Sequence, residues 1–337
     1  MTNKPENAKV FVTGPDGLLG SNLLRELIAR GYDITAMTET DKVAPTISSL
    51  PVKFVQGNLL EPEKLKEIIA GADIVIHCAA NTSVYPRRAE IINKVNIDGT
   101  QNIIDACIAN KVKKLIAVGT ANSFAPGPID QPGTEKNPYT GGQFGLDYMD
   151  SKKRASDLIL EAVRDHGLNA VIGNPTFMIG PYDSRPSSGA LILGVYNGKV
   201  PGYTNGGKNY VYVKDVAVAI ANAITMGKSG ESYILGNENL NYGDAFRKIA
   251  SILGVKPPRI RMPKFVVVGV GALNSFGAKI FKYRPAITYQ IARLSVGDHY
   301  YSSAKAVREL NMPQTNIDIA FQDAITWFRE NGYLTKK

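Results

Sequence analysis

The sequence predicts an α/β protein whose core is a doubly wound parallel sheet. Three observations support this fold class: short β-branched runs alternate with helical patterns over the first 175 residues, most of these runs are apolar throughout, and a glycine-rich turn follows the first run. Strands of a parallel sheet are covered by helices on both faces, so they read as continuous apolar runs. Repeated β–α units with right-handed crossovers build a doubly wound sheet.

The elements follow in order along the chain. The predicted strands are Lys9–Thr13, Asp33–Met37, Lys53–Gln56, Ile74–Cys78, Lys114–Val118, Ala170–Ile172, Tyr210–Val213 and Ser232–Leu235. The predicted helices are Leu18–Ala29, Pro62–Ile69, Ala89–Ala109, Gln143–Asp165 and Asp215–Met226. Residues 176–210 are rich in glycine and proline, which indicates loops over the carboxyl edge of the sheet. From Asn237 onward the pattern is mostly helical.

A chain of 337 residues exceeds the usual size of a single core. We therefore expect a Rossmann-type, NAD(P)-binding domain from residues 1–175 plus 210–236. Residues 176–209 plus 237–337 are expected to form a smaller, mostly helical C-terminal substrate-binding lobe.

The first turn has the features of a dinucleotide site. In VFVTGPDGLLG, Gly14, Gly17 and Gly20 are spaced three apart between the first strand and the first helix. Glycines let the backbone approach a pyrophosphate, and the helix N-terminus presents free N–H groups to it. A glycine triplet alone is weak evidence for a dinucleotide site, but its position between the first strand and the first helix makes the evidence specific. A tight packing turn is the alternative.

An acidic residue closes the second strand. Glu39 follows Thr38, 19 residues beyond Gly20, where a carboxylate accepts the ribose hydroxyls and repels a 2′-phosphate. This favours NAD over NADP as the cofactor. In the alternative interpretation Glu39 points to solvent, and Thr38 or Lys42 meets a phosphate.

Tyr148 and Lys152 are the candidate catalytic pair. Their i,i+4 spacing places both side chains on one helical face. A neighbouring ammonium and a positive nicotinamide ring would lower the pKa of the phenol, so Tyr148 could exchange a proton with an alcohol or ketone while hydride moves. Lys152 is also expected to hold the nicotinamide ribose.

Two further residues are candidates for this site. Thr120 ends a strand at the carboxyl edge, where its hydroxyl could bind the reacting oxygen; a turn or capping role is the alternative. Asn96 lies inside a predicted helix, where asparagine is unfavourable unless its side chain has a specific role. It could hold a backbone kink or a water that continues a proton path to Lys152, or be a structural amide.

Composition excludes several classes of protein. Two scattered cysteines, Cys78 and Cys107, fit buried reduced thiols and a cytoplasmic location, and no metal-ligand cluster is present. The net charge of +9 includes a basic group at Lys279, Lys282, Arg284 and Arg293, which we interpret as a solvated face rather than a nucleic-acid site. We expect no signal peptide and no membrane span, because the longest apolar stretch, Phe265–Leu273, has nine residues. That stretch is expected to be a lobe helix that could line an apolar pocket; a contact with a membrane surface is the less favoured alternative.

Several motifs together resemble one family. They are TGPDGLLG (13–20), GNLL (57–60), HCAA (77–80), NIDGT (96–100), VGTANSF (118–124), YMDSK (148–152), NPTFMIGP (174–181) and YVYVKDVA (210–217). In this order they resemble the extended short-chain dehydrogenase/reductases, the NAD-dependent epimerase/dehydratase group. The tail is similar to the dihydroflavonol reductase-like, 3β-hydroxysteroid dehydrogenase-like and hopanoid-associated branch.

The resemblance implies roles for named residues. It makes Thr120, Tyr148 and Lys152 a catalytic triad, with Asn96 as a fourth member. The implied cofactor-binding residues are Gly14, Asp16, Gly17, Leu18, Thr38, Glu39, Asn58, Leu59, Ala79, Val118, Tyr148, Lys152, Pro175 and Phe177. Asn58 stands where the family usually has an acid, Thr120 where it usually has a serine, and Glu39 where related reductases often carry an arginine. The family also implies a homodimer through the helices near Ala89 and Gln143.

Two enzymatic functions and one non-enzymatic function follow. The first is an oxidoreductase that interconverts a secondary alcohol and a ketone on a small-molecule, hydrophobic substrate, as the apolar residues Phe265–Leu273, Phe276, Phe281 and Tyr283 suggest. The second is a nucleotide-sugar epimerase or dehydratase that retains its NAD, with Lys208 partly replacing the arginine that meets a diphosphate. The third is a dinucleotide sensor, which would not need the Thr120, Tyr148 and Lys152 set.

Overall fold

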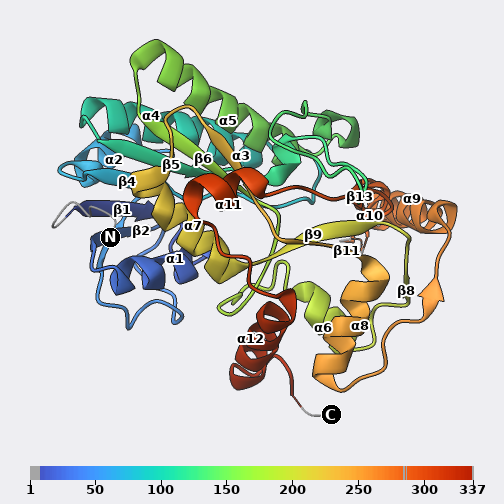
Figure 1. Ribbon diagram of the computed structural model, residues 1–337. Coiled ribbons are helices and arrows are strands. Elements are labelled where there is room, and N and C mark those ends of the chain that lie inside the picture. The colour runs from blue at the N-terminus through green and yellow to red at the C-terminus, as the bar shows by residue number, and fades with distance from the viewer. Residues whose placement is uncertain (1–7, 284, 286, 336–337) are drawn as a thin grey trace.

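A seven-stranded parallel sheet forms the centre of the molecule, as predicted. The computed structural model describes residues 8–283, 285 and 287–335; residues 1–7 and Arg284 of the basic group lie outside this range. The strand order is β10-β6-β5-β4-β1-β2-β3 (Figure 1). The strands are β1 (Lys9–Thr13), β2 (Asp33–Thr38), β3 (Lys53–Gln56), β4 (Ile74–His77), β5 (Lys114–Val118), β6 (Ala170–Pro175) and β10 (Ser232–Leu235). The order reverses between β1 and β4, and ligands bind at such a switch point in doubly wound sheets.

Successive side chains of the strands point to opposite faces of the sheet and pack into two separate hydrophobic cores. Val10 and Val12 of β1 pack into one cluster, whereas Phe11 packs into the other. The first cluster is covered by α1 (Leu18–Ala29) and α7 (Val213–Met226), and the second by α2 (Pro62–Ile69), α4 (Gly99–Ala109) and α5 (Asp147–His166). Apolar side chains are therefore required on both faces of every central strand.

Two of the predicted helices are interrupted. The segment predicted as Ala89–Ala109 divides into α3 (Glu90–Asn93), a π-helical turn η1 (Lys94–Asp98) and α4. The segment predicted as Gln143–Asp165 begins with the 3-10 turn η3 (Gly141–Phe144), after which Gly145 takes a positive φ of 59° and α5 starts at Asp147. The carboxylate of Asp147 accepts the Ala89 N–H at 2.7 Å, which ties the start of α5 to the residue before α3.

A second, smaller sheet lies beyond the carboxyl edge of the first (Figure 1). Its order is β11-β9-β13, and β7 also pairs with β9. These strands are β7 (Phe177–Ile179), β9 (Gly207–Tyr212), β11 (Glu238–Asn241) and β13 (Asp298–His299), and a separate pair joins β8 (Gly202–Tyr203) to β12 (Ile260–Arg261). Residues 210–212 thus pair in the second sheet, whereas α7 and β10 return to the first. The proposed division into two domains stays a prediction.

Most of the remaining helices lie on the side of the second sheet, whereas residues 304–310 pack against α7 and β10 of the main sheet. The remaining helices are α6 (Ala190–Tyr196), α8 (Tyr242–Leu253), α9 (Lys264–Phe281), α10 (Tyr289–Ser295), α11 (Ala304–Leu310) and α12 (Ile317–Glu330). The expectation that Phe265–Leu273 lines an apolar pocket is wrong: it belongs to α9, where Phe265 is 78% and Leu273 73% exposed. Only Val267, Gly271 and Ala278 of α9 are buried, because the helix packs against the rest of the protein along one narrow stripe. Among the described residues, α9 is the one helix that is long and apolar enough to cross a membrane by length and composition. The nine-residue stretch Phe265–Leu273, which is only part of α9, did not suggest this.

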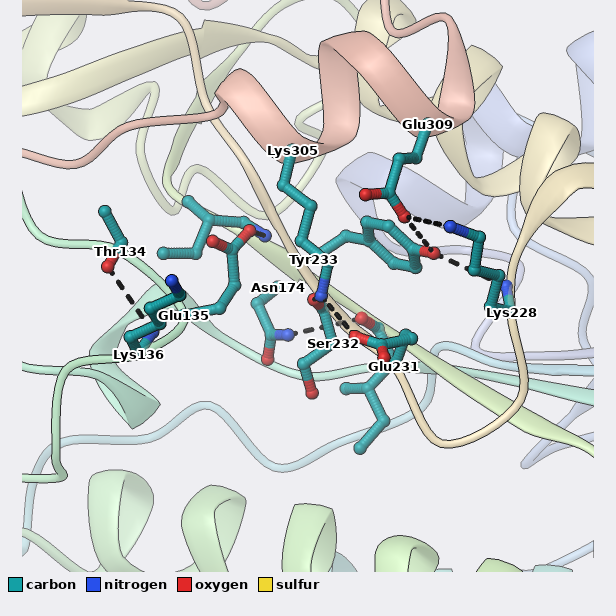
Figure 2. A network of polar contacts seen from close by, with 12 residues as sticks. Thr134, Glu135, Lys136, Asn174, Lys228, Glu231, Ser232, Tyr233, Lys305 and Glu309 are labelled. Carbon is teal, nitrogen blue, oxygen red and sulfur yellow. Dashed lines mark hydrogen bonds and ion pairs between the residues drawn. The ribbon is translucent and has the colours of Figure 1, made fainter.

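Side chains cover the outer edge of β10, the last strand of the main sheet. Figure 2 shows Glu135 beside this strand, where its carboxylate accepts the Ile234 N–H at 2.8 Å. Lys305 of α11 donates to the Ser232 carbonyl oxygen at 2.7 Å and pairs with Glu231. These contacts satisfy backbone groups that would otherwise offer an edge to another chain.

Candidate active site

The glycine turn after β1 is shaped by close backbone contacts. Gly14 has a φ of 65°, and a Cβ there would lie 2.7 Å from the Ala79 nitrogen. A Cβ on Gly20 would lie 2.1 Å from the Gly14 carbonyl oxygen. These two positions need glycine because the protein itself fills the space.

Gly17 differs from both of these glycines. The nearest protein atom to a Cβ at Gly17 is the Gly14 oxygen at 3.7 Å, so the protein does not exclude a side chain there. Gly17 is the N-cap of α1, and no side chain caps the helix. The N–H groups of Leu18 and the following residues in the first turn therefore have no intrahelical acceptor. An open glycine at an uncapped helix N-terminus fits the close approach of a pyrophosphate.

Asp16 lies in this turn and holds an ion pair across it. Arg185, from the loop after β7, donates to Asp16 at 2.6 Å. Both side chains are at least a third exposed. The sequence did not predict this pair, because the two residues lie 169 positions apart.

The residues that we expect to contact the adenosine lie at the carboxyl ends of β2 and β3. Glu39 is exposed, whereas Thr38 is buried and its hydroxyl donates to the Thr40 carbonyl at 2.9 Å. The side-chain oxygen of Asn58 accepts the Leu60 N–H, which orders the loop after β3. Leu59 is buried against Gly99 of α4.

Tyr148, Lys152 and Thr120 meet at the carboxyl end of β5. Tyr148 and Lys152 lie in the first two turns of α5, and Thr120 caps the 3-10 turn η2 (Ala121–Ser123) after β5. Lys152 is buried and donates to the Val118 carbonyl oxygen at 2.6 Å. The Thr120 hydroxyl lies close enough to the phenol to lower the pKa of Tyr148.

The protonation of the pair differs from the sequence-based expectation. Burial raises the pKa of Tyr148, and the Thr120 contact offsets only part of that rise. Burial also lowers the pKa of Lys152 to about 8. In the protein alone desolvation sets the direction, and the lowering that we expected from the ammonium does not occur. The lowering expected from a bound, oxidised nicotinamide ring stays a prediction. A phenol that keeps its proton is suited to donate it.

Asn96 binds two segments at once from the π-helical turn. Its side-chain oxygen accepts the Asn81 N–H at 2.7 Å, and its amide donates to the Asn81 carbonyl at 3.0 Å. The same amide donates to the Ser151 hydroxyl at 2.9 Å. Asn96 thus ties the loop after β4 to the turn of α5 that lies between Tyr148 and Lys152. No bond joins it directly to Lys152 among those recorded for the described residues.

A buried polar chain runs beneath these groups. The Thr13 hydroxyl contacts His77 Nδ1 at 2.8 Å, and His77 Nε2 contacts the Thr100 hydroxyl at 3.2 Å. Thr100 donates its own hydrogen to the Asn96 carbonyl, so the proton of the imidazole resides on Nε2. Burial, assisted by Lys152, lowers the pKa of His77 to about 3, which keeps the ring neutral.

The other expected cofactor residues lie along the same edge. Ala79 follows β4, and its N–H donates to the Thr13 hydroxyl at 3.1 Å. Pro175 closes β6 and is buried, and Phe177 begins β7. The ammonium of Lys208 sits 4.1 Å from the centroid of the Phe177 ring, and burial lowers the pKa of Lys208 to about 8.

The sequence argument missed several of these residues. Ser151 lies inside the YMDSK motif, but nothing in the sequence indicates its hydrogen bond with Asn96, which lies 55 positions earlier in the chain. Thr13 and His77 could have been found, because each is a polar residue that closes an otherwise apolar strand. Among the residues that the structure describes, no group of His, Cys, Asp and Glu is arranged to hold a metal ion.

Comparison with known proteins gives one family and similar structures. The family model described as "NAD dependent epimerase/dehydratase family" matches residues 10–236. The chain is 28% identical to the "Putative dihydroflavonol 4-reductase" of Synechocystis sp. over 329 residues, covering 96% of this chain and 95% of the relative.

Two more similarities extend over nearly the whole chain. The "Sterol demethylase protein B" of Methylococcus capsulatus is 30% identical over 330 residues, which cover 96% of this chain and 99% of the relative. The crystal structure of gox2253 superposes with a TM-score of 0.86 at 32% identity, and the match covers 98% of this chain and all of that one.

Proposed function

The chain belongs to the NAD dependent epimerase/dehydratase family, and from this premise we propose that it is a dehydrogenase or reductase that interconverts a secondary alcohol and a ketone. The proposal rests on one arrangement above all: a buried tyrosine and a threonine hydroxyl meet beside a lysine at the carboxyl edge of β5. A proton donor at this place is useful only when a reacting oxygen is present.

The cofactor would be held by the edge formed by β1, β2, β4 and β5. The N–H groups at Gly17 and Leu18 would bind the pyrophosphate, and Asn58 the adenine. Glu39 would accept the ribose hydroxyls, so we propose that NAD is preferred over NADP. When bound, the nicotinamide ring supplies or accepts the hydride. Lys152 would hold the nicotinamide ribose while it remains bonded to Val118.

Tyr148 would carry the proton. In the reducing direction its hydroxyl donates to the ketone oxygen, and Thr120 donates a second hydrogen bond to the same oxygen. The raised pKa of Tyr148 keeps the phenol protonated before reaction. In the oxidising direction the positive charge of the oxidised ring and of Lys152 would favour the phenolate, so the same group can accept the proton.

Asn96 would act as a positioning residue. It touches Asn81 and Ser151 rather than the reacting groups. Through these bonds it fixes the distance between the loop after β4 and the first turns of α5, which carry the catalytic pair. This supports the role of a backbone clamp.

A hydrophobic ketone or alcohol is the proposed substrate class. Relatives that cover at least nine-tenths of this chain are named as a sterol demethylase protein and a dihydroflavonol 4-reductase. The second candidate, a nucleotide-sugar epimerase or dehydratase, would use the half-buried Lys208 to meet an anionic group.

Cofactor absorbance at 340 nm separates these functions. Purified protein would be mixed with NADH or NADPH and a panel of oxo-steroids, flavonoid-like ketones and UDP- or GDP-sugars. Net oxidation of NADH by a ketone, absent in Tyr148→Phe, is the expected result. Conversion of a sugar nucleotide with no net change of absorbance would overturn the reductase proposal in favour of the epimerase.

We further propose a homodimer through α4 and α5 in the cytoplasm. Ile91 and Ile108, on α3 and α4, are 51% and 38% exposed and would be covered in such a pair. Light scattering on a size-exclusion column tests the dimer, and Ile108→Glu should reduce the mass to that of a monomer.

A further inference from the structure

The outward face of α9 is apolar along its whole length. Its exposed residues include only two charged ones, Lys264 and Lys279. At 100° per residue, the arc opposite the buried stripe contains no polar side chain. Its members are Phe265, Val266, Gly269, Val270, Ala272, Leu273, Phe276, Gly277, Ile280 and Phe281. A soluble protein rarely exposes such a continuous patch without a partner for it.

The net positive charge of the protein is concentrated in the segment of the chain that contains this helix. Residues 245–297 contain ten Lys/Arg and no Asp/Glu, whereas the other 284 residues carry 29 Lys/Arg against 30 Asp/Glu. Arg247 and Lys248 of this segment pair with Asp244 and Asp318. Among the described residues, no ion pair is recorded for Lys264, Lys279 or Lys282. Lys264 begins α9, Lys279 lies in its last turn and Lys282 follows it directly, so cations flank the apolar arc at both ends of the helix.

We propose that α9 docks this protein on an anionic lipid surface. Apolar side chains enter the boundary between headgroups and acyl chains, and the lysines at the two ends of α9 meet the anionic headgroups. A second copy of the chain fits less well, because it would bring two segments of like charge together. A nucleic acid would leave the apolar arc without a partner.

The connections of α9 place it in the membrane plane. The chain before α9 is fixed by the pairing of β12 with β8, and the chain after α10 by the pairing of β13 with β9. Gly271 lies against Ala292 and Thr288, so α10 is packed tightly along the inner side of α9. The segments before α9 and after α10 are thus both anchored by strand pairing in the same lobe. A helix that lies on the surface satisfies this topology, whereas a crossing helix would carry its distal end away from α10.

The pair formed by α9 and α10 also contacts the segment that precedes Tyr148. Arg293 of α10 donates to the Gln143 carbonyl at 3.4 Å, and its guanidinium lies 5.6 Å from the Phe144 ring centroid. Both of these residues belong to η3, just before Tyr148 in the chain. On a lipid surface, the segment before Tyr148 would therefore lie next to the docked helical pair.

Vesicle flotation tests the proposal directly. We expect the wild type to float with vesicles of phosphatidylglycerol and phosphatidylcholine, and to float less at 0.5 M NaCl or on phosphatidylcholine alone. The triple variant Phe265→Ser, Leu273→Ser, Phe276→Ser should lose at least about ten-fold in partition. The matched control is Ile319→Ser, which alters a half-exposed apolar residue of α12 and should float like the wild type. All three proteins should keep the same melting temperature, since the altered side chains are exposed.

A fluorescent reporter distinguishes insertion from simple adhesion. The chain has one tryptophan, Trp327, which is 8% exposed. In Phe276→Trp, brominated lipid should quench the added fluorescence, whereas wild-type Trp327 should be unaffected. The proposal would be overturned if the wild type failed to float with the vesicles, or if the triple variant floated like the wild type. It would also be overturned if the wild type bound no lipid but formed a dimer that the triple variant did not form, because α9 would then be a dimer interface.

Discussion

Lys152 of α5 donates to the carbonyl oxygen of Val118 at 2.6 Å, where β5 ends. This bond joins the helix that carries Tyr148 to the strand that leads into Thr120. It also fixes a buried ammonium, whose pKa burial lowers to about 8. The proposed chemistry depends on this ammonium at neutral pH.

The pKa of Lys152 predicts a pH dependence. The ammonium is present below pH 8 and is lost as the pH rises through that value, so kcat/KM for NADH in ketone reduction should fall above about pH 8. Lys208 has a similar pKa of about 8, so Lys208→Met is the necessary control and should keep the alkaline fall. A profile that stays flat from about pH 6.5 to 9.5 would contradict the role of Lys152.

Gly17 and Gly20 should respond differently to the same substitution. Gly17→Ala should fold like the wild type but weaken NADH binding by about ten-fold, because its Cβ would occupy only space left for the pyrophosphate. Gly20→Ala should lower the melting temperature severely, because its Cβ would meet the Gly14 oxygen. Calorimetric titration and thermal unfolding measure the two effects. Equal losses of stability would argue against a ligand at Gly17.

Asn96 should matter for both stability and catalysis. Asn96→Ala removes three hydrogen bonds and leaves both backbone groups of Asn81 without this partner. We expect a loss of about 1–3 kcal/mol in the free energy of unfolding by urea, together with a lower kcat. Ser151→Ala removes only one of the three bonds and should have the smaller effect. If the two variants lost the same stability, the clamp would not involve Asn81.

Glu39 should control the choice between the two nicotinamide cofactors. Glu39→Arg replaces an exposed carboxylate after β2 by a cation that can bind a 2′-phosphate. The ratio of kcat/KM for NADH to that for NADPH should fall at least about ten-fold. Asp41→Arg, two residues further along and also exposed, is the matched control for charge. An unchanged ratio in Glu39→Arg would place the adenosine ribose elsewhere.

The sequence was sufficient for the main sheet because local patterns determine it. Strands buried on both faces are mostly apolar, and β1, β5 and β10 have the predicted bounds. The partly exposed edge strand β3 also has its predicted bounds. The glycine turn was equally clear, since backbone contacts at Gly14 and Gly20 exclude any side chain.

The second sheet could not be read in the same way. Its strands are as short as two residues, and β13 pairs with β9 across about 90 positions of the chain. Pairing at such distance leaves no local period. The break at Gly145 and the π-helical turn around Asn96 depend on contacts such as Asp147 with Ala89, which likewise join distant segments.

Burial is the quantity that the sequence described least well. An apolar helix such as α9 has the same pattern whether it lies in a core or on a surface, and the structure leaves Phe276 66% exposed. The pKa of Tyr148 depends in the same way on the depth of the site. Desolvation raises the pKa of Tyr148, and the spacing between Tyr148 and Lys152 in the sequence could not reveal this.

The rate of hydride transfer in Tyr148→Phe tests the central claim most directly. Single-turnover oxidation of NADH by a ketone substrate should slow by about 10²–10⁴-fold, because the variant keeps the ring but lacks the proton donor. The affinity for NADH, measured by fluorescence titration, should stay within about two-fold of the wild type. Hydride transfer at the wild-type rate would contradict the assignment of Tyr148 as the acid, and with it the proposed reaction.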